Sequence, residues 1–214
     1  GKNYLDILKE RLDEPNYKKL MAINNPYLHE FVAKYIELCN PDSIFVSDGS
    51  DEALQYIREA AIRTGEEIPL AIPGHTVHFD GYYDQARDRE HTKFLLPKGV
   101  DLGPTIKAMD RDEGLREIHE ILKDIMKGHE LYVCFYCLGP TNSVFSIPCV
   151  QLTDSSYVAH SENILYRQGY EEFIKRGPTK EFFKFVHSEG ELDERKTSKN
   201  IDKRRIYIDL EEDT

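Results

Sequence analysis

Hydrophobic residues in the first half of the chain recur with the period of amphipathic helices. Between Asn25-Pro26 and Asn40-Pro41, apolar residues recur every three or four positions and predict a helix. A second helix is expected over residues 53–65, where Gly65 ends the pattern. A third is expected over residues 110–128, which opens with a capping box and closes at a glycine.

Short runs of β-branched and aromatic residues alternate with these helices. Residues 43–47 and 68–72 are predicted strands. The nearly continuous apolar run 131–138 is typical of a strand covered on both faces. Strands that alternate with helices predict an α/β fold, a layered sandwich in which helices flank a mixed sheet.

The second half of the chain has shorter apolar runs between polar turns. These runs predict further strands or short helices over residues 144–152, 157–166 and 182–186. A new strand is expected to begin at residue 206, although the chain stops soon afterwards. We therefore expect a piece of a longer protein with three parts: an α/β domain over 1–187, a charged connection over 188–205, and a strand over 206–214 that leads into a missing remainder.

The composition of the chain excludes several classes of protein. Of the 214 residues 40% are hydrophobic, which excludes a disordered chain. The 28 Lys and Arg against 39 Asp and Glu give a net charge of −11, which argues against nucleic-acid or membrane partners. We see no secretion signal and no apolar run of about 18 residues. Four cysteines are too few for a disulfide scaffold, so we expect free thiols and a cytoplasmic location.

The stretch 73–92 concentrates three histidines, two arginines and several carboxylates behind a predicted strand, where binding loops of α/β proteins lie. Arg87 and Arg89 are notable in so acidic a chain, because a guanidinium can bind a carboxylate or phosphate through two parallel hydrogen bonds. The equally strong alternative is a surface ion pair with a neighbouring acid.

Metal binding is a weaker hypothesis for the same stretch. His75, His78 and Asp80 have suitable ligand types at close spacing. Hydrogen bonding within a crowded loop explains these residues better, because so short a motif often occurs by chance.

Other motifs have ordinary structural explanations. Cys134 and Cys137 resemble a zinc or redox pair, but the two-residue period of a strand sends them to opposite faces, so we expect buried thiols. Asp48-Gly49-Ser50 is interpreted as a helix-capping turn, and residues 153–157 as a polar turn. The chain has no phosphate-binding glycine motif and no nucleophilic-serine motif.

Several segments, in order and at the right spacing, resemble the GTP-type phosphoenolpyruvate carboxykinases. The resemblance spans Pro26 to Leu210 and has an archaeal character. It is carried by L-C-N-P-D-S-I-F-V-S-D-G-S-D-E (38–52), L-Y-V-C-F-Y-C-L-G-P-T-N-S (131–143), V-Q-L-T-D-S-S-Y-V-A-H-S-E-N-I-L-Y-R-Q-G (150–169), and His187-Ser188 with Gly190.

This resemblance implies an α/β N-terminal domain that forms one wall of the substrate cleft. The family converts oxaloacetate and GTP to phosphoenolpyruvate, GDP and carbon dioxide in gluconeogenesis, with Mn²⁺ and Mg²⁺-GTP. Its substrate-binding arginine maps to Arg87 within Ala86–Thr92, although Arg89 would fit a shifted register. The metal ligands, nucleotide loop and other catalytic residues belong to a C-terminal nucleotide-binding domain that is missing here. No catalytic, cofactor-binding or metal-binding residue is therefore expected in this chain, and it should be inactive alone.

Two other functions remain open from the residues. The chain could be a free-standing α/β module that binds a small anionic metabolite through Arg87 and Arg89. A metal-dependent hydrolase built on His75, His78 and Asp80 is the weakest possibility.

Overall fold

The computed structural model describes residues 1–72, 75–77, 92–101, 103–104, 107–140, 145–190, 206–209 and 212–214. In these ranges the helices are α1 (Tyr4–Arg11), α2 (Glu14–Met21), α3 (Pro26–Cys39), α4 (Asp51–Arg63), α5 (Arg111–Leu122), α6 (Ser156–Leu165) and α7 (Tyr170–Arg176). The strands are β1 (Ser43–Val46), β2 (Ile68–Pro69), β3 (Thr76–Val77), β4 (Thr92–Leu96), β5 (Ala108–Asp110), β6 (Glu130–Leu138), β7 (Ile147–Thr153), β8 (Arg167–Gln168), β9 (Phe183–His187) and β10 (Ile206–Asp209). None of the helices so described is long and apolar enough to cross a bilayer.

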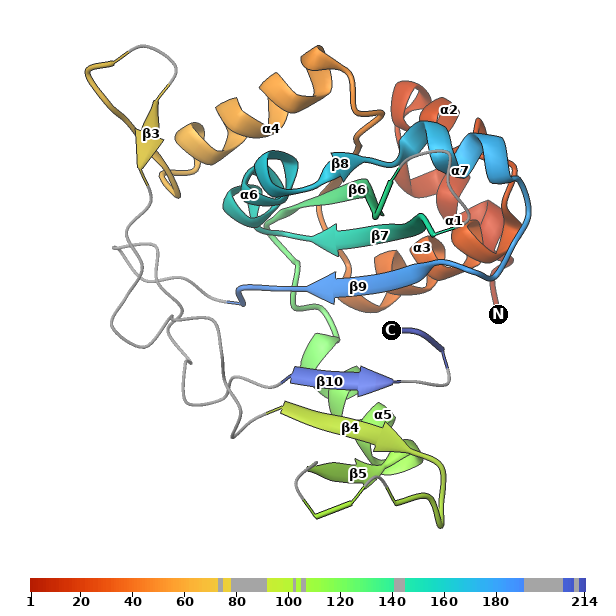
Figure 1. Ribbon diagram of the computed structural model, residues 1–214. Coiled ribbons are helices and arrows are strands. Elements are labelled where there is room, and N and C mark those ends of the chain that lie inside the picture. The colour runs from red at the N-terminus through yellow and green to blue at the C-terminus, as the bar shows by residue number, and fades with distance from the viewer. Residues whose placement is uncertain are drawn as a thin grey trace.

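The larger sheet has five strands in the order β1-β6-β7-β9, with β8 also paired to β6. β1 runs parallel to β6, β7 runs antiparallel to it, and β9 runs parallel to β7. The sheet is therefore mixed. Together with the helices on its two faces, it confirms the predicted α/β layered fold (Figure 1).

Strand β6 contributes to two hydrophobic cores because alternate residues point to opposite faces of the sheet. Val133 and Phe135 belong to the larger core, which includes residues of α1, α2, α3, α5 and α7. Cys134 and Tyr136 belong to the second core, with residues of α4 and α6. Burial on both faces explains why this strand has the continuous apolar sequence that predicted it.

A smaller sheet of three parallel strands has the order β10-β4-β5 and packs against α5 (Figure 1). At its edge, Arg111 Nε lies 3.1 Å from Asp209 Oδ1 and Arg111 Nη2 lies 3.1 Å from Asp209 Oδ2. This bidentate ion pair joins the start of α5 to β10, so Arg111 contacts a strand that lies 98 positions later in the chain.

The predicted helices begin where polar caps place them. Asn25 caps α3 by accepting hydrogen bonds from the backbone N–H groups of Tyr27 and Leu28, and Asp110 caps α5. α5 ends earlier than expected, at Leu122, and turns continue to residue 128. Two helices, α1 and α2, were not predicted, although Asn3 and Asp13 cap them in the same way.

The strand predicted over residues 68–72 is shorter than expected. Only Ile68 and Pro69 are in β2, which pairs antiparallel with β3. The chain then turns back, with the N–H of His75 donating to the carbonyl of Ile72 over 3.1 Å. This two-stranded hairpin, described at residues 68–72 and 75–77, is called the stem below.

Candidate functional site

Most of the predicted binding residues lie outside the described part of the chain. Arg87, Arg89, His78 and Asp80 are in this group, so their roles stay predictions. His75 is described. Its side chain is exposed, and its carbonyl accepts a hydrogen bond of 2.8 Å from the N–H of Leu70.

The two ends of the predicted substrate-binding stretch are described. The stem precedes it and lies beside α4 (Figure 1). β4, which begins at Thr92 in the smaller sheet, follows it. The stretch therefore connects the helical layer at one face of the larger sheet with the smaller sheet.

A buried carboxylate, Glu66, lies two residues before the stem and caps α6. It accepts hydrogen bonds from the hydroxyls of Ser155 and Ser156, at 2.8 and 2.7 Å, and from the N–H groups of Ser156 and Tyr157, at 3.3 and 3.4 Å. Free N–H groups and the helix dipole at this end both favour a negative charge. Glu66 thus joins the segment after α4 to the start of α6.

A second carboxylate, Asp154, lies beside this cap at the end of β7. It accepts hydrogen bonds from the hydroxyl of Ser188 at 2.7 Å and from the N–H of Glu189 at 3.1 Å. On the neighbouring strand, His187 Nδ1 lies 2.9 Å from Thr153 Oγ1. Burial raises the pKa of Asp154 and lowers that of His187, in each case because it disfavours the charged form.

The carboxyl group of Glu189 completes this buried polar cluster. Burial and the negative charge of Glu66 raise its pKa to about 8, and a hydrogen bond between the two carboxyl groups adds to the shift. Two adjacent carboxylates rarely remain ionised together in a buried place, so Glu189 holds a proton at neutral pH.

The acid cluster, Glu66, Asp154 and Glu189, acts as a structural junction. Its carboxyl oxygens are hydrogen-bonded to serines, backbone N–H groups or each other, and its negative charge would repel an anionic substrate. This junction was not predicted, because residues 153–157 were expected to form a simple polar turn. Ser155 does cap α6, but the interacting acid lies 89 positions away.

The two cysteines of β6 and the capping turn before α4 behave as the sequence predicted. Cys134 and Cys137 lie in separate environments, and both are buried free thiols; Cys137 Sγ lies 3.0 Å from Ser146 Oγ. Ser50 caps α4 by accepting from the N–H of Ala53, and its own N–H donates to Asp48. Within the described residues, no group of three or more acidic, His or Cys side chains is placed to hold a metal ion.

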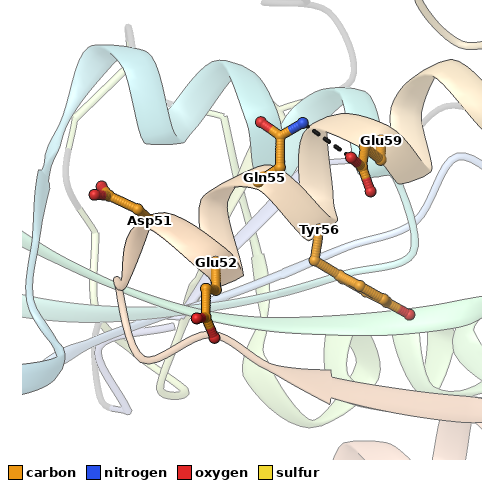
Figure 2. Close-up of a pocket in the computed structure, with 5 residues that line it drawn as sticks. All are labelled: Asp51, Glu52, Gln55, Tyr56 and Glu59. Carbon is orange, nitrogen blue, oxygen red and sulfur yellow. Dashed lines mark hydrogen bonds between the residues drawn. The ribbon is translucent and has the colours of Figure 1, made fainter.

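A shallow, open hollow lies on the exposed side of α4, lined by Asp51, Glu52, Gln55, Tyr56 and Glu59 (Figure 2). Gln55 donates a hydrogen bond of 3.0 Å to Glu59, and the Tyr56 hydroxyl donates to Glu130 at 2.8 Å. Three carboxylates and no cation make this surface unsuitable for a dicarboxylate or a phosphate. It is not the substrate site that the sequence predicts.

A mixed sheet between helical layers, with a smaller parallel sheet beside it, defines the chain as a layered α/β domain. The family described as phosphoenolpyruvate carboxykinase N-terminal domain matches residues 30–214. The chain therefore belongs to this family, as the resemblance of its motifs indicated.

Several proteins similar to this chain are named phosphoenolpyruvate carboxykinase [GTP]. A phosphoenolpyruvate carboxykinase [GTP] of Thermococcus sibiricus is 65% identical over 209 residues, which are 98% of this chain and 33% of the relative. Proteins of the same name are 62% identical over 210 residues in Pyrococcus horikoshii (98% of this chain, 34% of the relative) and 34% identical over 171 residues in Chlamydia caviae (78% and 28%). The chain spans about a third of the length of these relatives.

Proposed function

We propose that this chain is the N-terminal part of a GTP-dependent phosphoenolpyruvate carboxykinase, which forms phosphoenolpyruvate, GDP and carbon dioxide from oxaloacetate and GTP. The observation that carries this proposal is the 65% identity to a relative named for that activity, over 98% of the chain. The remaining two thirds of the relatives' length would supply the nucleotide-binding domain, which is the partner of this one.

The chain's own contribution to the reaction would be Arg87, with Arg89 as the alternative. Oxaloacetate is a dianion, and the net charge of this chain is −11, so binding needs a local cation. A guanidinium can hold a substrate carboxylate through two hydrogen bonds and orient the neighbouring bonds for decarboxylation and phosphoryl transfer. Positioning of this kind supplies much of the rate in phosphoryl transfer.

Metal and nucleotide would be bound by the rest of the protein. The resemblance implies Mn²⁺ and Mg²⁺-GTP, which would neutralise charge on the enolate and on the transferring phosphate. In the described part of the chain, no cluster of ligands fits such an ion. We therefore assign no step of the metal chemistry to these residues.

The reaction is tested with the full-length enzyme that contains this chain. We expect phosphoenolpyruvate to form from oxaloacetate with GTP, and much more slowly with ATP. Arg87→Lys should recover only part of the activity that Arg87→Ala loses, because a point charge cannot replace the guanidinium fork. An enzyme that forms no phosphoenolpyruvate with GTP would refute the proposal.

A further inference from the structure

The last residues of the chain lie between the edges of the two sheets. The N–H of Thr214 donates to the carbonyl of Asp209 over 3.0 Å, and the N–H of Asp209 donates back to Thr214 over 2.7 Å. The carbonyl of Asp213 accepts a hydrogen bond of 3.0 Å from the N–H of Lys184 in β9, and Lys184 Nζ donates to the carbonyl of Glu212 over 2.6 Å. Consecutive residues therefore bond to β10 on one side and to β9 on the other, and Figure 1 shows the C-terminus between these strands.

Both strands have an open edge at this place. Among the described strands, β9 pairs only with β7 and β10 only with β4. The backbone N–H and C=O groups of alternate residues in a strand point to the same side. Because Lys184 donates to Asp213 and so faces away from β7, Val186 faces away from β7 as well. Such an edge is a template for pairing with another strand.

The polypeptide that follows Thr214 is the best candidate to cover these edges. The family that matches this chain is an N-terminal domain, and the chain spans only a third of its relatives, so a long polypeptide follows this region in those proteins. Its first residues start between β9 and β10, because Asp213 and Thr214 already lie there. An extended chain that continued from Thr214 would bond to both edges.

We propose that the segment directly after Thr214 in the whole protein forms a β-strand between β10 and β9, which joins the two sheets into one. The paired hydrogen bonds of Asp209 and Thr214 make this strand antiparallel to β10. It is parallel to β9, because β9 and β10 point in opposite directions (Figure 1). In this register the first residue after Thr214 donates its N–H to the carbonyl of Lys184, and its carbonyl accepts from the N–H of Val186.

The direction of the new strand decides where the rest of the protein begins. β10 starts at Ile206, opposite Thr92, which is the first residue of β4. A strand antiparallel to β10 and parallel to β9 ends at the edge where β4 and β10 start and β9 ends. The remainder of the protein therefore starts at this edge. This inference concerns the fold and does not require the proposed reaction.

Disulfide trapping in the full-length enzyme tests the register. Val186→Cys is combined with one cysteine introduced at the first, second or third position after Thr214. The second position lies directly opposite Val186, about 4.8 Å away between Cα atoms, which suits a disulfide, whereas the first and third side chains point to the other face of the sheet. We expect the second position to cross-link at a yield roughly tenfold above either neighbour. With Phe185→Cys as the matched control, the preferred partner should be the first position instead.

The results distinguish the possible occupants of the edge. Cross-linking that follows this alternation supports the strand, whereas equal yields at all positions, or no link in a folded enzyme, would overturn it. A link between two enzyme molecules would assign the edge to a second copy and also overturn it. None of these results depends on the formation of phosphoenolpyruvate, so failure of the proposed function would be seen separately.

Hydrogen exchange of the unsubstituted enzyme gives a test that no folding defect of a variant can obscure. The N–H of Val186 should exchange at least roughly tenfold more slowly than a free amide, because it is bonded to the new strand. Exchange at the rate of a free amide would overturn the inference.

Discussion

The carboxyl group of Glu189 provides a pH-dependent test of the buried acid cluster. Its pKa is raised to about 8 by burial and by Glu66, whereas an unfolded Glu titrates near 4.5. Between these two values the unfolded chain has lost this proton and the folded chain retains it. The folded state therefore becomes less stable as the pH rises, and the effect ends only above pH 8.

The histidines act in the opposite direction near pH 6.5. Burial lowers the pKa values of His29, His119, His160 and His187, so the unfolded chain binds more protons there and their contribution to stability still grows as the pH rises above 6.5. These histidines are unchanged in the Glu189→Gln variant, so their contribution cancels when the two proteins are compared. Each pH unit changes the free energy of unfolding by about 1.4 kcal/mol for one proton. From pH 6.5 to 8, allowing for half-ionisation of Glu189 at the end, we expect the share of Glu189 in the free energy of unfolding to fall by roughly 1.5 kcal/mol.

The assay is urea unfolding of the 214-residue chain at pH 6.5 and 8, for the parent and for Glu189→Gln. The glutamine cannot ionise but still donates to Glu66, so this variant should lack Glu189's share of the pH dependence. Asp154 is present in both proteins, and its contribution cancels in the comparison. Glu181→Gln, which changes an exposed acid, should behave as the parent. If the free energy of unfolding changed by the same amount between pH 6.5 and 8 in the parent and in Glu189→Gln, the reasoning would be refuted.

Three further predictions concern the fold. Gly169→Ala should destabilise the chain by more than about 2 kcal/mol, because an added Cβ would lie 2.3 Å from the carbonyl oxygen of Tyr136; a smaller loss in urea unfolding would contradict the close approach. Asn25→Ala should cost roughly 2–3 kcal/mol, since it removes the cap of α3 and a 2.9 Å hydrogen bond to the carbonyl of Thr179; an unchanged unfolding midpoint would count against this. Burial raises the pKa of Cys134 to about 12, so this thiol should react with a disulfide reagent at pH 8 only after unfolding, and rapid labelling of the native chain would show that it is accessible.

Local chemistry made much of the fold predictable from the sequence. Asn25 and Asp110 mark the starts of helices, because their side chains accept hydrogen bonds from free N–H groups only two or three residues further on. Such a cap depends on neighbouring residues alone, so the sequence shows it. The apolar run of β6 predicted a doubly covered strand for a similar reason. The short helices α1 and α2 carry the same capping signals, at Asn3 and Asp13, so the sequence could have revealed them.

The buried polar cluster could not be found in this way. Glu66 and Ser155 are 89 positions apart, and nothing near Glu66 in the sequence distinguishes it from a surface acid of a chain with 39 acids. Only the packing of α4 beside α6 brings the acid to the helix end. For Arg87 the information comes from the family and not from packing. The resemblance implies a substrate-binding role, whereas the residues around Arg87 in the sequence do not distinguish that role from a surface ion pair.

The most direct test of the central claim is the kinetics of Arg87→Ala in the full-length enzyme, with Arg89→Ala and the exposed Arg116→Ala measured beside it. If Arg87 holds the substrate carboxylate, its loss should raise KM for oxaloacetate and lower kcat/KM, while KM for GTP and the Arg116→Ala enzyme stay at the parent values. If Arg89→Ala gave this result and Arg87→Ala did not, Arg89 would be the substrate-binding residue. Parent values of both constants for the Arg87→Ala and Arg89→Ala enzymes would contradict the claim that this domain supplies the substrate-binding cation.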